Sequence, residues 1–260
     1  MNPIKIILIG SGNLATQLGT SLHSSGYFIS QVYSPQLKNA TLLAKKVKAE
    51  AINNLKDIDT TATIYIIAVK DDAIATVAKQ LKLNDKMVVH TSGSVSMDVL
   101  KNISKNIGVF YPLQTFSKTK KANFKTIPMC IEANNKSTLE NLTFFAKSIS
   151  TKVENINSAQ RQQLHVAAVF ACNFSNHLYT LADNYLKANK LSLDLLKPLI
   201  AETADKIKAG KPADMQTGPA VRGDADTIDR HLKLLEQHPE WQDLYKKISD
   251  SIRVAFSNLK

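Results

Sequence analysis

The chain has 260 residues, of which 44% are hydrophobic, and this suits one large folded domain or two moderate ones. The formal net charge is +11, but 29 of the 33 basic residues are lysines scattered singly or in pairs, which favours a solvated surface over a nucleic-acid partner. Cys130 and Cys172 form neither a metal-binding spacing nor a disulfide framework, and no apolar run reaches the ~18 residues of a membrane span. The first apolar run is too short for a signal peptide, so we expect a cytoplasmic protein. From the lysine pattern, the cysteine spacing and the length of the apolar runs, we expect no metal, membrane or nucleic-acid partner.

The first fifteen residues predict a strand, a tight turn and a helix over 13–25. An apolar run at 4–9 leads directly into the segment Gly10-Ser11-Gly12-Asn13-Leu14-Ala15. Gly10 permits the sharp turn, Gly12 lets a pyrophosphate approach the backbone, and Ala15 lets the helix pack closely. The free N–H groups at the helix start attract phosphate. The segment therefore predicts a dinucleotide site that includes Ser11, Asn13 and Leu14; the alternative is a glycine turn that binds nothing.

The second expected strand, 28–33, ends at Ser34, about twenty residues beyond the glycines. In a dinucleotide-binding fold this position binds the adenosine ribose, and NAD-dependent proteins place Asp or Glu there. A carboxylate would repel the 2′-phosphate of NADP, whereas Ser34 can donate a hydrogen bond to it and Lys38 can attract it. The sequence therefore favours NADP, with NAD possible. The alternative is that Ser34 and Pro35 only form a turn and cap the next helix.

Strands and helices alternate through the first half. The pattern predicts an α/β fold, with a doubly wound, mainly parallel sheet of the Rossmann type. Ligands of such sheets bind outside the carboxyl ends of the strands, where we expect Val69, Lys70, Thr91 and Ser92 to line the cofactor. We also expect Asp71 or Asp72 to cap the helix that follows. The remaining elements are strands at 49–52, 63–69, 86–90, 107–111, 126–132 and 152–154, and helices at 36–48 and 137–148.

The composition changes after residue 157, and no further strand pattern follows. We therefore expect two domains, a dinucleotide-binding domain at 1–156 and an all-helical domain at 157–260. Helices are expected at 158–189, 194–209, 225–237 and 239–259. The long Ala-rich helix in so small a domain indicates burial against a second copy, which predicts a homodimer.

Polar residues interrupt the apolar pattern of the long helix. At ~100° per residue, His165 and Asn176 share a face and Asn173 lies about 80° from His165. His165 could donate or shuttle a proton, and Asn173 could hold a carbonyl oxygen during hydride transfer. The alternative is that these residues are satisfied groups of the core or of a dimer interface.

A second candidate is the loop at 217–224. Arg222, one of only four arginines, could bind a substrate carboxylate through two parallel hydrogen bonds. The alternative is an interhelical turn in which Asp224 caps the next helix. His90, at a strand end, is a third candidate and is as well explained as a packing residue or as part of the cofactor wall.

These segments together resemble the Rossmann-like, NADP-dependent oxidoreductases of uncharacterised substrate that carry a helical C-terminal domain. Those are related to pyrroline-5-carboxylate reductase and, more distantly, to β-hydroxyacid and 6-phosphogluconate dehydrogenases. The resemblance implies the fold, an NADP site and often a dimer, but no substrate. It covers nearly the whole chain and is carried by 10–15, His90-Thr91-Ser92-Gly93, Tyr111-Pro112-Leu113-Gln114-Thr115-Phe116, 165–177 and 217–224.

Two departures from these relatives bear on mechanism. β-Hydroxyacid dehydrogenases place a catalytic lysine four residues before an asparagine, where this chain has Val169 before Asn173. Pyrroline-5-carboxylate reductases carry serine- and glycine-rich runs where this chain has 172–175 and 217–220. Neither active site is therefore simply inherited.

The sequence thus predicts an NADP-dependent oxidoreductase that moves a hydride between nicotinamide and a small carbonyl, imine or hydroxy acid in the cleft between the domains. His165, Asn173 and Arg222 are the expected substrate residues. The alternative is a non-catalytic NADP-binding sensor or partner-binding regulator, which the missing lysine supports.

Overall fold

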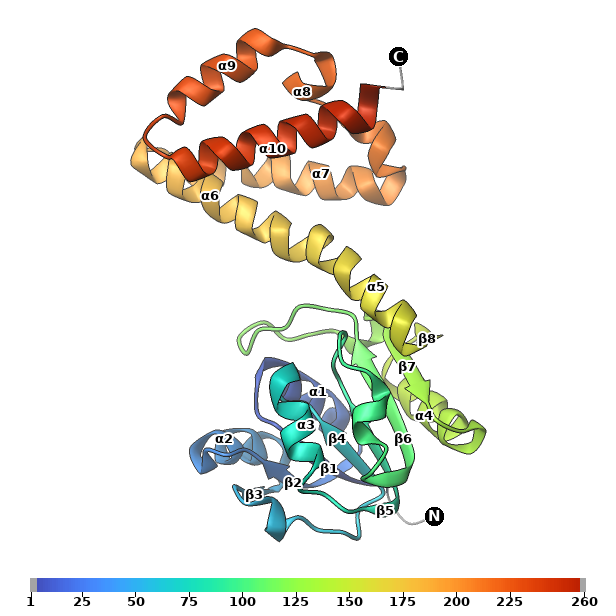
Figure 1. Ribbon diagram of the computed structural model, residues 1–260. Helices are drawn as coiled ribbons and strands as arrows, with labels where there is room; N and C mark the ends of the chain where they lie inside the picture. The colour runs from blue at the N-terminus through green and yellow to red at the C-terminus, as the bar shows by residue number, and fades with distance from the viewer. Residues whose placement is uncertain (1–3, 258–260) are drawn as a thin grey trace. The chain divides into compact units, whose positions relative to one another are not determined.

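The computed structural model describes residues 4–257, which form two compact units (Figure 1). The first unit extends to Cys172 and the second begins at Asn173. The domain boundary expected between residues 156 and 157 stays a prediction.

An eight-stranded sheet in the order β3-β2-β1-β4-β5-β6-β7-β8 organises the first unit. Neighbouring strands are parallel except β6 and β7, which are antiparallel, so the predicted α/β fold with a mainly parallel sheet is confirmed. The direction of strand order reverses at β1 and β4, and ligands of such sheets bind at the carboxyl ends of the strands there. The strands are β1 (Lys5–Ile9), β2 (Phe28–Tyr33), β3 (Glu50–Ile52), β4 (Ile64–Ile67), β5 (Asn84–His90), β6 (Ser104–Pro112), β7 (Met129–Ala133) and β8 (Val153–Asn155).

Apolar side chains cover both faces of the central strands. Ile6 and Leu8 of β1 pack with helices α1 (Asn13–Ser24), α2 (Leu37–Val47) and α4 (Lys136–Ile149). Residues 7 and 9 of the same strand pack on the opposite face with α3 (Asp71–Ala78). The alternation follows from the two-residue period of a strand, and burial on both faces explains why β1 and β4 are continuous apolar runs.

The prediction that Asp71 or Asp72 caps α3 is wrong, because the N-cap is Lys70. Both aspartates lie in the first turn, where their negative charge complements the positive end of the helix dipole. Asp71 also accepts a hydrogen bond from the Ser94 hydroxyl, so its side chain joins α3 to the loop after β5.

The second half of the chain contains the expected helices but not one continuous α-helix over 158–189. A π-helical segment, Val169–Phe174, separates α5 (Ser158–Ala168) from α6 (Ser175–Ala188). Hydrogen bonds from i to i+5 widen the helix there, so the 100° spacing used to relate His165 to Asn173 and Asn176 does not hold through it. The remaining helices are α7 (Lys197–Ala209), α8 (Pro219–Arg222), α9 (Ala225–Leu234) and α10 (Pro239–Phe256), and short 3₁₀ turns lie at Leu55–Asp57, Met97–Leu100, Phe124–Thr126, Leu193–Leu195 and Pro212–Met215.

None of the helices within 4–257 combines the length and the apolar character that crossing a lipid bilayer requires.

Candidate functional site

The glycine turn joins the ends of three strands. Gly10 has φ +128°, and a Cβ atom built on it would lie 2.1 Å from the carbonyl oxygen of Ala68. Its N–H donates to the Tyr33 carbonyl at 2.8 Å. Only glycine fits a positive φ pressed against another backbone, so Gly10 allows the ends of β1, β2 and β4 to meet.

Gly12 has a different role. It is the N-cap of α1, its side-chain position has no atom within 4 Å, and no side chain caps the helix. The first N–H groups of α1 therefore face open space beside a backbone without a Cβ, which is the arrangement that suits a pyrophosphate. Ser11 and Leu14 are half-buried beside this turn, and Ala15 is fully buried, as close packing of the helix requires.

The side chains of α1 also hold the loop after β6. Asn13 Nδ2 donates to the Phe116 carbonyl at 2.9 Å, and Gln17 Nε2 donates to the Ser117 carbonyl at 2.7 Å. Gln17 Oε1 accepts the N–H of Ala122 at 3.0 Å. The side-chain amide of Asn13 is therefore engaged with this loop.

The end of β2 carries no carboxylate. Ser34 is only 5% exposed, its hydroxyl accepts a hydrogen bond from the Ser11 hydroxyl at 3.0 Å, and its N–H donates to Ile52. It does not cap α2, whose N-cap is Gln36, so the helix-cap alternative is wrong. Lys38 lies exposed in the first turn of α2. A serine pair beside an exposed lysine fits the 2′-phosphate of NADP and offers no acidic partner for the ribose hydroxyls of NAD.

The loop after β5 is shaped by its own hydroxyl groups. Thr91 is buried, and its N–H donates to the Ile67 carbonyl at 3.1 Å, which joins the ends of β4 and β5. Ser92 Oγ accepts the N–H groups of Ser94 and Val95 at 3.1 and 3.0 Å. Beside this loop Val69 is half-buried and Lys70 is exposed.

His90 is a core residue. The imidazole is fully buried, and its Nδ1 accepts the N–H of Ser92 at 3.2 Å. Burial, followed by the nearby positive charge of Arg161, lowers the pKa of His90 to about 4. Within residues 4–257 its Nε2 has no hydrogen-bond partner. His90 is therefore neutral near pH 7 and packs behind the loop.

Three segments converge on His165 within the first unit. The Tyr111 hydroxyl, at the end of β6, lies 3.3 Å from His165 Nδ1 on α5, and the two rings meet edge to face at 6.3 Å. A Cβ atom on Gly93, in the loop after β5, would lie 2.7 Å from that nitrogen and 2.9 Å from the hydroxyl oxygen. The imidazole is half-buried at the sheet edge that carries the glycine turn.

Both halves of the chain match known protein families. Residues 5–93 match the family described as NADP oxidoreductase, coenzyme F420-dependent, and residues 127–252 match a domain of unknown function (DUF2520). A crystal structure of a candidate NADP oxidoreductase from Bacteroides fragilis is 42% identical, with a TM-score of 0.92 over 96% of this chain and 98% of that one. The chain belongs to this NADP oxidoreductase family.

More distant structures share the fold. An imine reductase from Myxococcus stipitatus in complex with NADP+ is 15% identical, with a TM-score of 0.61 over 98% of this chain and 93% of that one. A pyrroline-5-carboxylate reductase from Coxiella burnetii is 16% identical, with a TM-score of 0.59 over 100% and 99% of the two chains. No curated protein matches the chain. The prediction of an NADP-dependent oxidoreductase is thus confirmed at the level of the family and its cofactor.

A buried ion pair of this oxidoreductase was not expected from the sequence. Arg161 of α5 is fully buried and pairs with Glu132 of β7, while its other terminal nitrogen donates to the Val95 carbonyl at 2.6 Å and to Ser158 Oγ at 3.1 Å. These bonds fix the start of α5, and with it His165, to the loop after β5. The scarcity of arginine is the one sequence signal for Arg161, and the same signal applies to Arg222.

Asn173 and Arg222 lie in the second unit. Asn173 is exposed on the π-helical segment. Arg222 ends α8 with its side chain 62% exposed, 3.9 Å from the Asp224 carboxylate. Asp224 accepts the N–H of Thr227 at 3.1 Å and is the N-cap of α9, which the interhelical-turn alternative required. The substrate roles of Asn173 and Arg222 stay predictions.

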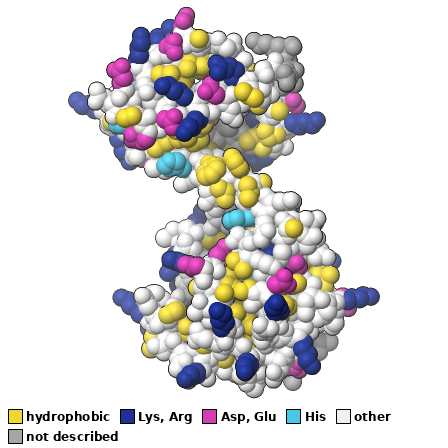
Figure 2. All heavy atoms as spheres, in the orientation of Figure 1, with side chains coloured by type: hydrophobic (Ala, Val, Ile, Leu, Met, Phe, Trp, Pro, Cys, Tyr) yellow, Lys and Arg dark blue, Asp and Glu magenta, His cyan; other side chains and the backbone are white. Residues whose placement is uncertain are grey.

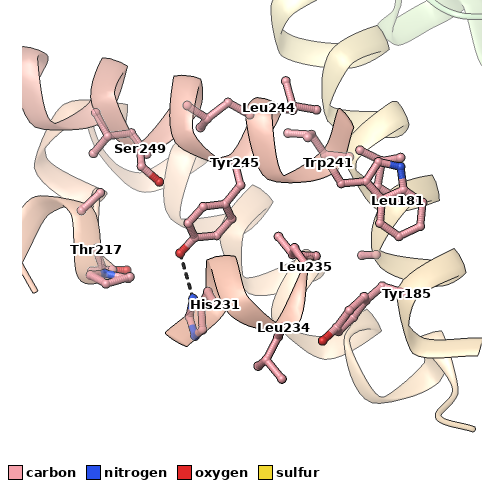
Figure 3. Close-up of a pocket in the computed structure, with 17 residues that line it drawn as sticks. Leu181, Tyr185, Thr217, His231, Leu234, Leu235, Trp241, Leu244, Tyr245 and Ser249 are labelled. Carbon is pink, nitrogen blue, oxygen red and sulfur yellow. Dashed lines mark hydrogen bonds between the residues drawn. The ribbon is translucent and has the colours of Figure 1, made fainter. Parts of the chain in front are cut away.

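The helical unit surrounds a cavity of about 580 Å³ between α6, α8, α9 and α10 (Figure 3). A polar pair in its wall is His231 Nδ1 and the Tyr245 hydroxyl, 2.8 Å apart and labelled in the figure. Most of its wall is apolar, with Leu178, Leu181, Leu235, Trp241, Leu244 and Ile252 contributing. No group of three His, Cys, Asp or Glu side chains in the described part of the chain is placed to hold a metal ion.

Proposed function

We propose that this NADP oxidoreductase transfers a hydride between nicotinamide and a small carbonyl, imine or hydroxy-acid substrate, with His165 as the proton donor or acceptor. The observation that carries the proposal is the meeting of His165, Tyr111 and Gly93 at the carboxyl edge of the sheet. Reduction of a C=N or C=O bond needs a proton at the heteroatom, and a positioned histidine is the commonest side chain for that transfer.

The cofactor residues are proposed from the same edge. The N–H groups of 11–14 would bind the pyrophosphate, and Ser34 with Lys38 would bind the 2′-phosphate. NADPH supplies the hydride when bound. The nicotinamide would lie along Val69, Lys70, Thr91 and Ser92, which follow the ends of β4 and β5.

The substrate residues are proposed to divide the remaining work. His165 would hold or move the proton, Asn173 would hold the substrate oxygen or nitrogen by its amide, and Arg222 would pair with a carboxylate. Val169 stands where the β-hydroxyacid dehydrogenases place their catalytic lysine, so the proposal does not use that mechanism, and the distant relation to 6-phosphogluconate dehydrogenases stays a prediction. The placement of the substrate between the domains and the cytoplasmic location also stay predictions.

The first experiment is a titration of the protein with NADPH and NADH, followed by nicotinamide fluorescence. We expect tighter binding of NADPH and, with a panel of small imines and carbonyl compounds, NADPH oxidation. The variant His165→Asn should lower kcat by about 10²–10⁴-fold and leave the Kd for NADPH unchanged. Tight NADPH binding without turnover of any compound in the panel would overturn this function and support the non-catalytic sensor.

We propose further that the helical unit associates with a second copy of the chain. Ala220 is the one buried residue described in 173–257, and Figure 2 shows hydrophobic side chains open to the surface of this unit. Protein interiors are close-packed, so we expect side chains of another molecule to fill an apolar cavity of about 580 Å³. A second helical unit carries equally exposed apolar helices that suit this wall. Light scattering should give twice the 28.7 kDa of one chain, and a single-chain mass at micromolar concentration would exclude the homodimer.

A further inference from the structure

We propose that Tyr111 is a positioning residue for His165. Its hydroxyl binds Nδ1 of the imidazole and leaves Nε2 as the nitrogen that exchanges a proton with the substrate. This inference rests on the proposed function, because it assigns a partner to the proposed proton-transfer residue. Tyr111 belongs to β6 and His165 to α5, so the assignment depends on a contact between residues 54 positions apart in the chain.

The phenol is held rigidly. Tyr111 is 8% exposed, and in the antiparallel ladder it pairs with Cys130 of β7. It belongs to a buried cluster with Val109 and Cys130, and the half-buried Leu164 packs against this cluster. The hydroxyl therefore has a fixed position relative to the sheet, and the ring of His165 must adjust to it.

The direction of the hydrogen bond follows from the protonation state of the phenol. Burial first, and then negative charge on Cys130 and Asp71, raise the pKa of Tyr111 to about 12, while the positive charge of Arg161 acts in the opposite direction. The hydroxyl thus keeps its proton near pH 7 and can donate it to a neutral imidazole. Since Nδ1 then accepts, the hydrogen of the neutral ring is on Nε2. A hydroxyl oxygen also accepts, so the same contact holds Nδ1–H of the imidazolium.

The backbone of Gly93 lies against both the His165 imidazole and the Tyr111 hydroxyl. A Cβ there would approach both His165 Nδ1 and the Tyr111 hydroxyl to less than 3.0 Å, so the contact between them requires glycine. The loop is kept in place by the Arg161 bond to the Val95 carbonyl and by Gln162 Nε2, which donates to the Ser94 carbonyl at 2.8 Å. Both residues lie on α5, so the helix that carries His165 also fixes the wall behind it.

The experiment is ¹⁵N NMR of the imidazole rings in the full chain at pH 8, with the His165 signals assigned from their loss in His165→Asn. A ring nitrogen that carries hydrogen and one that accepts a hydrogen bond differ widely in ¹⁵N chemical shift. We expect one tautomer in the wild-type protein, with hydrogen on Nε2, and a mixture in Tyr111→Phe. A mixture in the wild-type protein, or hydrogen on Nδ1, would overturn the assignment.

Tyr65→Phe is the matched control. Tyr65 is also buried, with a pKa raised to about 12 by burial, but its hydroxyl donates to the Asp59 carbonyl at 2.6 Å in another part of the sheet. This variant should leave the His165 tautomer unchanged, and an equal change in both variants would mean that the effect is structural.

Activity supplies an independent test. Tyr111→Phe should lower kcat about 10- to 100-fold, with the Kd for NADPH unchanged, whereas Tyr65→Phe should keep kcat within about twofold. Unchanged kcat in Tyr111→Phe, beside a large loss in His165→Asn, would contradict the positioning role. If no substrate is turned over but the NMR result holds, the proposed function fails and the contact of Tyr111 with Nδ1 stands.

Discussion

The two units of the chain bury their residues in different ways. In the first, both faces of the sheet are covered by helices, and fully buried side chains reach from β1 to α5. In the second, Ala220 is the one buried residue among those described, and most large apolar side chains are partly or largely open. The sheet unit therefore closes its core with its own side chains, whereas the helical unit leaves apolar side chains exposed, which is the observation behind the homodimer proposal.

The largest effect on stability is expected for a substitution in the core of the sheet unit. Phe145 of α4 is 1% exposed and packs on the rings of Tyr27 and Phe110, with centroids 5.1 and 5.0 Å away. Phe145→Ala should lower the free energy of unfolding by about 3–5 kcal/mol, because it leaves a cavity. Urea denaturation followed by circular dichroism measures this. A loss below about 1 kcal/mol would show that the core of the sheet unit is not closed.

The glycine turn offers a second contrast, within the first unit. Gly10→Ala places a Cβ against the Ala68 carbonyl at positive φ, and should cost about 2–4 kcal/mol of stability. Gly12→Ala meets no atom within 4 Å and should change stability by less than about 1 kcal/mol. It should nevertheless weaken NADPH binding at least tenfold, since its methyl group would occupy the approach of the pyrophosphate. Equal stability losses in the two variants would contradict these separate roles.

His90 gives a pH-dependent prediction for the same unit. Its pKa is about 4 in the folded protein, against about 6.5 in an unfolded chain. The unfolded chain therefore binds more protons between these values. The stability contributed by neutral His90 is complete above pH 6.5 and falls by about 3 kcal/mol as the pH drops to 4. His90→Asn, which keeps an acceptor for the Ser92 N–H, should lose this part of the pH dependence. The free energy of unfolding, measured by chemical denaturation at pH 4–6.5, is compared between the wild-type protein and the variant. An equal dependence on pH in both would show that His90 does not cause this loss of stability.

The smallest effect on folding is expected in the helical unit. Leu234 of α9 lines the cavity and is 65% exposed, so Leu234→Ala should change the unfolding of one chain by less than about 0.5 kcal/mol. The homodimer proposal adds that its dissociation constant rises at least tenfold, as sedimentation equilibrium would measure. Lys208→Ala on the exposed surface of α7 serves as the control, since its exposed side chain pairs with Asp205 on the same helix. An unchanged dissociation constant in both variants would argue against the cavity as the interface.

Local signals in the sequence explain why the sheet unit was well predicted. The turn at Gly10 and the apolar runs of β1 and β4 depend on neighbouring residues, so their place followed from spacing alone. The π-helical segment was not predictable, because Val169–Phe174 has the composition of an ordinary α-helix. The predicted cap at Asp71 or Asp72 was wrong because the start of α3 differed by one residue.

The candidate site could be predicted only in part, because it depends on contacts between distant segments of the chain. His165 was singled out as a polar residue in an apolar helix, but its contact with Tyr111 joins distant segments that only the fold brings together. The rule that placed Thr91 and Ser92 at the carboxyl edge applies equally to Tyr111 at the end of β6, and it could have identified this residue. The Arg161–Glu132 pair had no such signal, because burial of a charge depends on the packing around it.

Hydride transfer is tested most directly with NADPH that carries deuterium at both C4 positions of the nicotinamide, the panel of small imines and carbonyl compounds, and mass spectrometry of the products. We expect one deuterium in the product of the wild-type protein, and a rate about 10²–10⁴-fold lower in His165→Asn at equal NADPH occupancy. Tight NADPH binding without deuterium in any product, or an equal rate in His165→Asn, would contradict it.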